Sequence, residues 1–256
     1  MDVAVRAAKA AGEILLAHRG RVTVERKAGF RDLVTEADRL AEAAASRTIL
    51  EAFPDHSLLG EETGEHQGQS TWRWLVDPLD GTTNYAHGLP HFAVSVALVG
   101  QDGPVVGVVH LPALGETYSA ARGRGAWCNG RKLSVSAASC LEDCLLVTGF
   151  PHDLSPGRPT NLDHMEALVR RSRGVRLVGA AAIDLAYVAA GVFDAYWDLS
   201  NHAWDVAAGV LLVEEAGGRV SDMAGGRLDL FRPRLLASNG QVHDELLRVF
   251  AAGQID

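Results

Sequence analysis

The segment 77–84, with the sequence DPLDGTTN, combines side chains that suit a metal ion with side chains that suit a phosphate. It follows the apolar run 72–76, which we expect to be a buried strand, so Asp77 and Asp80 stand where that strand ends. Gly81 permits an unusual backbone conformation, and hydroxyls and backbone amides follow it. Carboxylates favour a divalent cation, whereas amides and hydroxyls favour a phosphate. The same residue types are common in ordinary turns, which is the alternative interpretation.

Two further acids, Glu61 and Asp205, occupy comparable places in the sequence. Glu61 follows the apolar strand expected at 57–60, and Asp205 lies in the first turn of a helix that is apolar almost all round. A buried carboxylate needs a cation or hydrogen-bond donors, although a favourable interaction with the helix dipole is an alternative for Asp205. Converging carboxylates without His or Cys indicate Mg²⁺, which in pairs can activate a water and stabilise a leaving oxygen in phosphoryl hydrolysis.

Asp38 has a structural interpretation in the sequence. Thr35 and Asp38 have the spacing of a capping box at the start of the helix expected at 36–53. On that interpretation, Asp38 only caps the helix.

Several other classes of protein are disfavoured by the sequence. It contains neither a P-loop nor the Gly-x-Ser-x-Gly elbow of a hydrolase, and Cys128 stands where a dinucleotide fingerprint would need Gly. The net charge of −8 and the lack of a basic run argue against nucleic-acid binding. Three cysteines without a Cys-x-x-Cys pattern suggest reduced, mostly buried thiols. With no expected signal peptide or membrane span, we expect a cytoplasmic protein.

The periodicity of apolar residues predicts two halves in a layered α/β (α+β) fold. Residues 1–140 combine two long helices with an antiparallel sheet and carry most of the candidate metal ligands; residues 141–256 alternate strands with helices. Helices are predicted at 2–18, 36–53, 161–173, 181–190, 204–216 and 240–250, and Leu40 is expected on the core side of the helix at 36–53. Strands are predicted at 57–60, 72–76, 92–99, 104–110, 117–120, 145–149, 175–178, 193–197, 219–221 and 235–238.

Five segments besides 77–84 carry further patterns in the same order along the chain: 32–38, 60–62, 123–130, 179–185 and 204–209. Together they resemble the inositol monophosphatase family, which belongs to the lithium-sensitive, Mg²⁺-dependent sugar phosphatases. The resemblance covers nearly the whole chain. It implies the αβαβα sandwich shared by inositol monophosphatases and fructose-1,6-bisphosphatases.

The resemblance implies a role for each of the four candidate metal-binding acids. Glu61, Asp77, Asp80 and Asp205, with the Leu79 carbonyl, resemble the family's ligands for two or three Mg²⁺ ions in each active site. Glu61 also resembles one of the family's catalytic residues. The resemblance therefore favours the metal interpretation of segment 77–84 over the ordinary turn.

The water and the phosphate have their own candidate residues. Asp38 and Thr82 resemble the pair that orients the attacking water, so Asp38 is expected to do more than cap a helix. Gly81, Thr82 and Thr83 resemble the amides that hold the phosphate. Lys27 matches a lysine in the family's mobile active-site loop.

The side of the site that would receive the alcohol departs from the family. Gly179, Ala180, Ala181, Asp198 and Asp205 are the expected substrate contacts. Ala180 stands where Ser or Thr is common, and Asp198 stands where many members carry Glu. A direct contact from the shorter Asp198 would need a closer substrate or a bridging water.

The resemblance implies a phosphomonoesterase that acts on inositol monophosphate or a related polyol phosphate. Fructose 1,6-bisphosphate, histidinol phosphate and a nucleotide 3′-phosphate are alternative substrates on the same fold. A regulatory binding protein is the alternative from another class, and the complete acid set argues against a purely noncatalytic role. By resemblance we also expect a homodimer and inhibition by lithium.

Overall fold

The computed structural model describes residues 1–21, 24–26, 33–151, 155 and 160–252. The helices are α1 (Asp2–His18), α2 (Glu36–Ala52), α3 (Thr82–Ala86), α4 (Leu162–Val169), α5 (Ala181–Ala189), α6 (Ala203–Glu215) and α7 (His243–Ala252), with a 3₁₀ turn at Leu141–Asp143. The strands are β1 (Val24–Arg26), β2 (Leu33–Thr35), β3 (Ser57–Gly60), β4 (Gly64–His66), β5 (Arg73–Asp80), β6 (Ala93–Gly100), β7 (Gly103–Leu111), β8 (Glu116–Ala121), β9 (Ala126–Cys128), β10 (Arg131–Lys132), β11 (Leu145–Thr148), β12 (Gly174–Arg176), β13 (Ala195–Asp198), β14 (Arg219–Asp222) and β15 (Leu235–Ser238).

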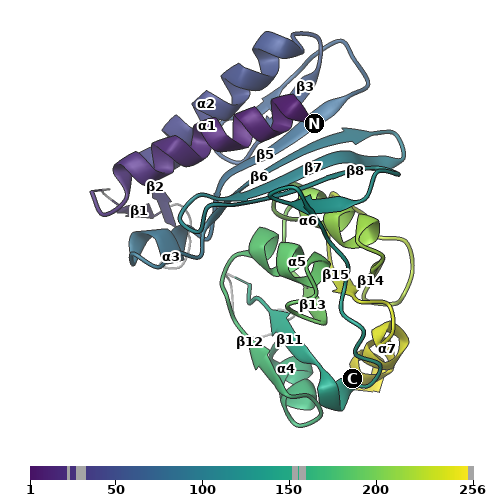
Figure 1. The fold of residues 1–256 in the computed structure, drawn as a ribbon. Coiled ribbons are helices and arrows are strands. Elements are labelled where there is room, and N and C mark those ends of the chain that lie inside the picture. Colours follow the sequence, from purple (N-terminus) through teal and green to yellow (C-terminus); the bar gives the residue numbers. More distant parts are fainter. Residues whose placement is uncertain (22–23, 27–32, 152–154, 156–159, 253–256) are drawn as a thin grey trace.

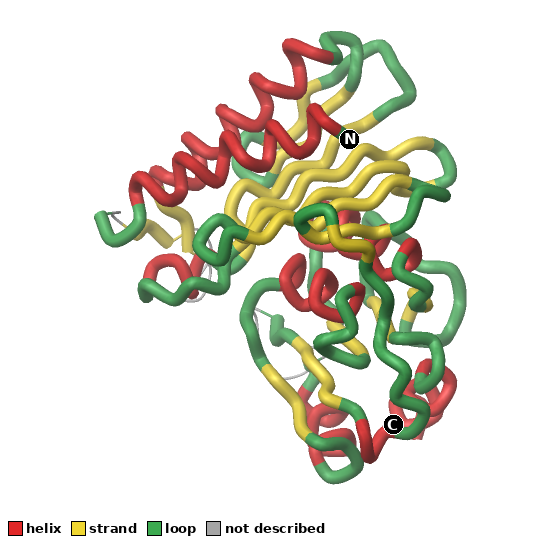
Figure 2. Tube along the Cα trace, viewed as in Figure 1, coloured by secondary structure: helices red, strands yellow, loops and turns green. Residues whose placement is uncertain are grey.

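Five layers make up the fold, as Figures 1 and 2 show. An eight-stranded sheet has the order β10-β9-β8-β7-β6-β5-β3-β4, and a five-stranded sheet has the order β12-β11-β13-β15-β14. Helices α1 and α2 cover one face of the larger sheet, α5 and α6 lie between the sheets, and α4 and α7 cover the outer face of the smaller sheet. This arrangement confirms the predicted αβαβα sandwich.

The N-terminal helix pair follows the predicted hydrophobic pattern with one exception. Ala4, Ala7, Ala11 and Leu15 of α1 are fully buried, as the helical spacing predicts. The prediction that Leu40 belongs to the core side of α2 is wrong, because its side chain is 40% exposed. The buried stripe of α2 instead follows small residues from Ala37 through Ala41 to Ala45.

A parallel pair within the larger sheet determines where the site forms. Strands β3 and β5 are parallel, with Gly60 opposite Val76, so the chain leaves both strands at the same edge. Strand β5 continues to Asp80, beyond the predicted end at residue 76. Its register against β6 shifts between Asp77 and Asp80, so Pro78 lies at an irregularity, where a missing N–H is tolerated.

Helix α6 joins the second half of the sequence to the first sheet. It contacts β5, β6, β7 and β8, and Gly107 of β7 lets it come close, since a Cβ there would lie 2.7 Å from the Ala208 carbonyl oxygen. At the far end of α6, Glu215 accepts hydrogen bonds from the amides of Gly123 and Gly125 at 2.6 and 2.7 Å. Helices α5 and α6 contact strands of both sheets, so the two predicted halves of the chain are packed together. The division of the chain into two domains near residue 140 stays a prediction.

Smaller differences from the sequence prediction concern the ends of elements and polar segments. Helix α4 ends at Val169 rather than at residue 173, and the short polar strand β4 lies where no strand was predicted. Cys128 and Cys144 are buried and Cys140 is exposed, all three as free thiols. No helix in the described part of the chain is long and apolar enough to cross a membrane.

Candidate active site

Four acids from three different elements approach one another at the edge where β3 and β5 end. Burial, followed by the charges of Glu61, Asp80 and Asp205, raises the pKa of Asp77 well above its ordinary value. Burial, with the charge of Asp205 first and that of Glu61 after it, likewise raises the pKa of Asp80. The structure therefore brings together the four acids that the sequence singled out. We call them the acid cluster.

Two members of the acid cluster, Asp77 and Asp80, have no cationic side chain paired with them among the described residues. Backbone amides satisfy only part of each carboxylate: the Leu79 N–H donates to Asp77 Oδ1 at 2.9 Å, and the Ala182 N–H donates to Asp80 Oδ2 at 2.6 Å. Neighbouring buried carboxylates repel one another unless a cation or a proton lies between them.

This donor set fits Mg²⁺, which binds oxygen ligands and commonly uses carboxylates. The side chains are not arranged as a metal centre in this structure. Among the described residues, no three Asp, Glu, His or Cys side chains form a group that could hold a metal ion. The fit therefore lies in the all-oxygen chemistry and the mutual repulsion of the acids. Side chains that repel one another without a cation are expected to draw together around one.

Asp205 also caps its helix. Its Oδ2 accepts a hydrogen bond from the His202 N–H at 2.7 Å, in a capping box at the start of α6. The His202 ring stacks on Trp204 with 4.8 Å between centroids, and its side chain is 68% exposed. Asp205 thus lies in the first turn of α6 as expected, where it caps the helix, and it also belongs to the acid cluster.

Asp38 likewise forms the capping box that its sequence spacing predicts. Asp38 Oδ2 accepts hydrogen bonds from the Thr35 N–H at 2.8 Å and from the Thr35 hydroxyl at 2.6 Å, and the side chain is 1% exposed. Burial, with the Asp38 charge as a second cause, raises the pKa of Tyr85 to about 12, which places Asp38 close to α3. The capping bonds fix the carboxylate without excluding a second role.

The candidate phosphate turn connects β5 to α3. Gly81 has φ +88°, in the left-handed region, and a Cβ there would lie 2.9 Å from the His91 carbonyl oxygen, so this position requires glycine. The Thr82 hydroxyl donates to the Leu79 carbonyl at 3.0 Å, and the described hydrogen bonds of Thr82 do not include Asp38. Thr83 is exposed at the start of α3. Lys27 lies outside the described residues.

Asn84 holds the phosphate turn against the segment 179–181, a connection that the sequence did not reveal. Its side-chain amide donates to the carbonyls of His91 at 2.7 Å and Val178 at 2.8 Å. Gly179 follows with φ +83°, and Ala180 lies within van der Waals reach of the Cβ that Gly81 lacks. Segments nearly a hundred residues apart in the sequence therefore line one side of the site.

Asp198, the predicted substrate contact, is already satisfied by the protein. Its Oδ1 accepts hydrogen bonds from the N–H and the hydroxyl of Ser200, each at 2.9 Å, and its Oδ2 accepts one from the Tyr196 hydroxyl at 3.3 Å. The residue is 4% exposed, and a side chain at Gly149 would collide with its carboxylate. Contact between Asp198 and a substrate stays a prediction.

Two buried acids near the site were missed from the sequence. Glu42 is fully buried on α2, and Asp184 on α5 is 1% exposed with Oδ1 unpaired among the described residues. Burial, followed by the charges of Asp80 and Asp198, raises the pKa of Asp184 well above its ordinary value. Both acids occur at apolar spacing within their helices, which is the signal that could have identified them.

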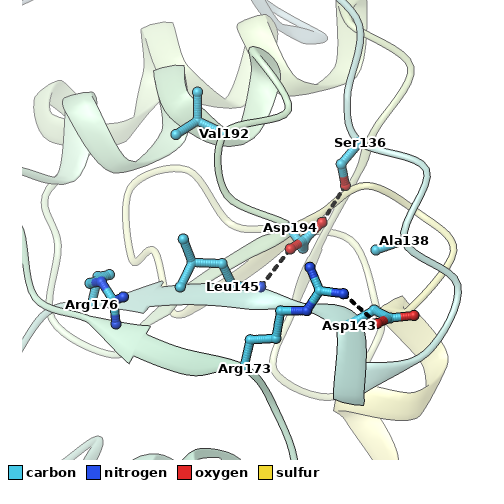
Figure 3. A pocket seen from close by; sticks show the side chains of 8 residues that line it. All are labelled: Ser136, Ala138, Asp143, Leu145, Arg173, Arg176, Val192 and Asp194. Carbon is cyan, nitrogen blue, oxygen red and sulfur yellow. Dashed lines mark hydrogen bonds and ion pairs between the residues drawn. The ribbon is translucent and has the colours of Figure 1, made fainter.

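A separate cavity of about 630 Å³ lies beside the smaller sheet and includes no member of the acid cluster. Figure 3 shows Asp194 within it, bonded to Ser136 and to the backbone amide of Leu145. Arg173 forms an ion pair with Asp143 at 2.6 Å at its rim. The carboxylate of Asp194 is therefore already hydrogen-bonded within the protein on both oxygens.

Known proteins are similar to this chain in both sequence and fold. The family model described as "Inositol monophosphatase family" matches residues 1–253. Two relatives are the "Nus factor SuhB" of Pseudomonas aeruginosa, 43% identical over 96% of this chain and 94% of its own, and the "Fructose-1,6-bisphosphatase/inositol-1-monophosphatase" of Thermotoga maritima, 40% identical over 97% and 94%. The crystal structure of extragenic suppressor protein suhB from Bartonella henselae superposes with a TM-score of 0.92 at 44% identity, covering 98% of this chain and 97% of that one. The chain belongs to the inositol monophosphatase family.

Proposed function

We propose that this protein is a Mg²⁺-dependent phosphomonoesterase that hydrolyses inositol monophosphate or a related polyol phosphate. The observation that carries this proposal is the acid cluster, in which Asp77 and Asp80 face other carboxylates and no described Lys or Arg pairs with them. Membership of the family supports the same reaction. A cation is the simplest means of offsetting this repulsion.

Glu61, Asp77, Asp80, Asp205 and the Leu79 carbonyl would hold the Mg²⁺ ions. Bound there, Mg²⁺ would lower the pKa of a coordinated water and offset charge on the leaving oxygen. The protein's part is to fix these oxygens. The Leu79 and Ala182 amides each hold one carboxylate of the acid cluster, and the Thr82 hydroxyl is bonded to the Leu79 carbonyl.

The attacking water and the phosphate fall to the neighbouring residues. Asp38, fixed by its two hydrogen bonds from Thr35, would accept a hydrogen bond from the water, and Thr82 would orient the same water. The amides of Gly81, Thr82 and Thr83 would receive the phosphate oxygens. No covalent intermediate on the protein is needed, because an in-line attack by water cleaves the P–O bond.

The alcohol group would lie against residues 179–181, with Asp198 and Asp205 nearby. This side offers few free polar groups, since Ala180 has no hydroxyl and Asp198 is bonded to Ser200 and Tyr196. Substrates with different alcohols, including fructose 1,6-bisphosphate, histidinol phosphate and a nucleotide 3′-phosphate, therefore remain candidates. The name of the Thermotoga maritima relative combines two such activities.

A second candidate function is a regulatory one. A relative that is 43% identical is called a Nus factor, and the intact acid cluster is compatible with a combined enzymatic and regulatory role. By resemblance to the family, we also propose a homodimer and inhibition by lithium.

Phosphate release from inositol 1-phosphate, fructose 1,6-bisphosphate, histidinol phosphate and 3′-phosphoadenosine phosphate tests the proposal. We expect turnover of at least one substrate with Mg²⁺, its loss with EDTA, and its recovery when Mg²⁺ is restored. Turnover that persists in EDTA would overturn the metal mechanism. Absence of turnover on all four substrates, in a chain that binds Mg²⁺, would favour the regulatory candidate.

A further inference from the structure

Glu42 is a fully buried carboxylate on the inner face of α2, among the alanines that pack against the larger sheet. No described Lys or Arg forms an ion pair with it. A buried carboxylate is costly unless hydrogen-bond donors surround it, so the identity of its donors indicates what it is for.

All of the hydrogen bonds that Glu42 accepts from described residues come from the turn after β3. The Glu62 N–H donates to Oε2 at 2.8 Å, and the Thr63 N–H donates to Oε1 at 2.8 Å. The Thr63 hydroxyl also donates to Oε1. The two carboxylate oxygens thus fasten two consecutive residues, beginning directly after Glu61.

The carboxylate of Glu42 also leaves no room for a side chain at Gly60, the residue before Glu61. A Cβ at Gly60 would lie 2.5 Å from the carboxyl carbon of Glu42, so a side chain there would displace it. Glu61 itself donates its N–H to the Val76 carbonyl at 3.2 Å, next to Asp77 on β5. The backbone of Glu61 is therefore held to β5 on one side and by Glu42 on the other.

We propose that Glu42 is a positioning residue that fixes Glu61 within the acid cluster and so sets the affinity for the divalent cation. This inference rests on the proposed function, because it takes Glu61 as a ligand of that cation. Glu42 does not belong to the acid cluster: the acids whose charges act on Asp77 and Asp80 do not include it. It acts through the backbone of the turn that carries Glu61.

Glu42→Gln keeps the volume of the side chain but replaces one accepting oxygen with an NH₂ group, which would face a backbone donor. We expect this variant to bind Mg²⁺ about 10- to 100-fold more weakly, the range typical of residues that hold metal ligands in place. Turnover at saturating Mg²⁺ should stay close to wild type, because the ligands themselves are unchanged. Glu51→Gln, the same chemical change at an exposed position of α2, is the matched control and should bind as wild type does.

Affinity for Mg²⁺ and Mn²⁺ is measured by isothermal titration calorimetry on the full chain, and the Mg²⁺ dependence of phosphate release is measured beside it. Wild-type affinity in a folded Glu42→Gln protein would overturn the inference, even if its Tm fell. If that variant does not fold, Thr63→Val removes one donor at the exposed end of the contact, and a few-fold loss of affinity is expected. Unchanged affinity there would equally overturn it. Failure of the wild-type chain to bind either ion would contradict the proposed function instead.

Discussion

The two sheets contain buried carboxylates of opposite character. At the edge of the larger sheet, Asp77 and Asp80 face other acids, and each accepts few hydrogen bonds. In the smaller sheet, Asp198 accepts from Ser200 and Tyr196, and both oxygens of Asp194 are bonded within the cavity of Figure 3. Burial alone does not distinguish the groups, because Asp77, Asp194 and Asp198 are all buried. What distinguishes them is whether the protein supplies the donors.

Under the proposed function, this difference separates acids that stabilise the fold from acids that would bind a cation. A saturated carboxylate gains from each donor, and removing it leaves those donors buried and unpaired. An unsaturated cluster costs free energy in the absence of a cation and is retained only if it serves a function. The predictions below test the contrast, beginning with the largest expected effect.

Asp80→Asn should lower turnover at least about 10³-fold, because it removes a charged oxygen ligand worth several kcal/mol to the reaction. The same change relieves repulsion from Asp205 and Glu61, so Tm without divalent cations should not fall. Phosphate release and thermal unfolding measure the two effects, and Asp102→Asn in the exposed β6–β7 turn is the control. Near-wild-type turnover would show that Asp80 is not a metal ligand, and would contradict the proposed difference between the acids of the two sheets.

Asp194→Ala should have the reverse pattern. It leaves the Leu145 amide and the Ser136 hydroxyl without their acceptor, which is expected to cost about 2–4 kcal/mol of unfolding free energy. Turnover per folded molecule and Mg²⁺ affinity should be unchanged. Urea unfolding gives the stability, and Asp194→Asn, which keeps one acceptor, should lose less. Weakened Mg²⁺ binding in Asp194→Ala would show that the two groups are not separate.

The smallest expected effect is a pH dependence of stability. The pKa of Asp77 is raised in the folded chain, so between the ordinary value of 3.8 and the raised value only the folded form keeps the proton. Its contribution therefore destabilises the folded state increasingly as pH rises through this window. Asp77→Asn should remove that penalty. Without metal, its Tm should exceed that of wild type by about 3 °C near pH 8 and by less as pH falls.

Comparing wild type with Asp77→Asn at each pH cancels the opposite contribution of buried histidines, such as His243, whose pKa burial lowers to about 4. Saturating Mg²⁺ should reverse the difference, since only wild type keeps the full ligand set. Differential scanning fluorimetry with and without EDTA measures both. A gap that is constant across pH would mean that Asp77 is not titrating between the two states.

Much of the fold was predictable because apolar spacing is a property of the sequence. The alanine stripe of α1 and the continuous apolar run of β6 identify their elements directly. The errors arise where other factors decide. Strand β4 depends on pairing with β3, and the extension of β5 depends on a register shift that accommodates Pro78. Leu40 is exposed because smaller residues fill the interface of α2.

The acid cluster was predictable for a related reason, because charged residues that interrupt apolar elements are conspicuous. Whether the folded protein supplies hydrogen-bond donors to a carboxylate cannot be read from the sequence in the same way. The partners of Asp198 are Ser200 and Tyr196, and they meet only once β13 and the following turn are folded. Glu42 was missed because a glutamate on a helix usually faces solvent, and its donors lie about twenty residues further along the chain.

If the acid cluster binds a cation as proposed, helix α6 would make the packing of the layers depend on that cation. It contributes Asp205 to the acid cluster at one end and fastens Gly123 and Gly125 through Glu215 at the other, while packing across the larger sheet. A cation that binds the complete cluster binds only the conformation in which α6 is docked. By mass action, a concentration 100 times its dissociation constant would favour that conformation by about 2.7 kcal/mol. The divalent ion would then stabilise the contact between distant parts of the chain. Its removal would weaken the packing of α6 between the sheets as well as stop turnover.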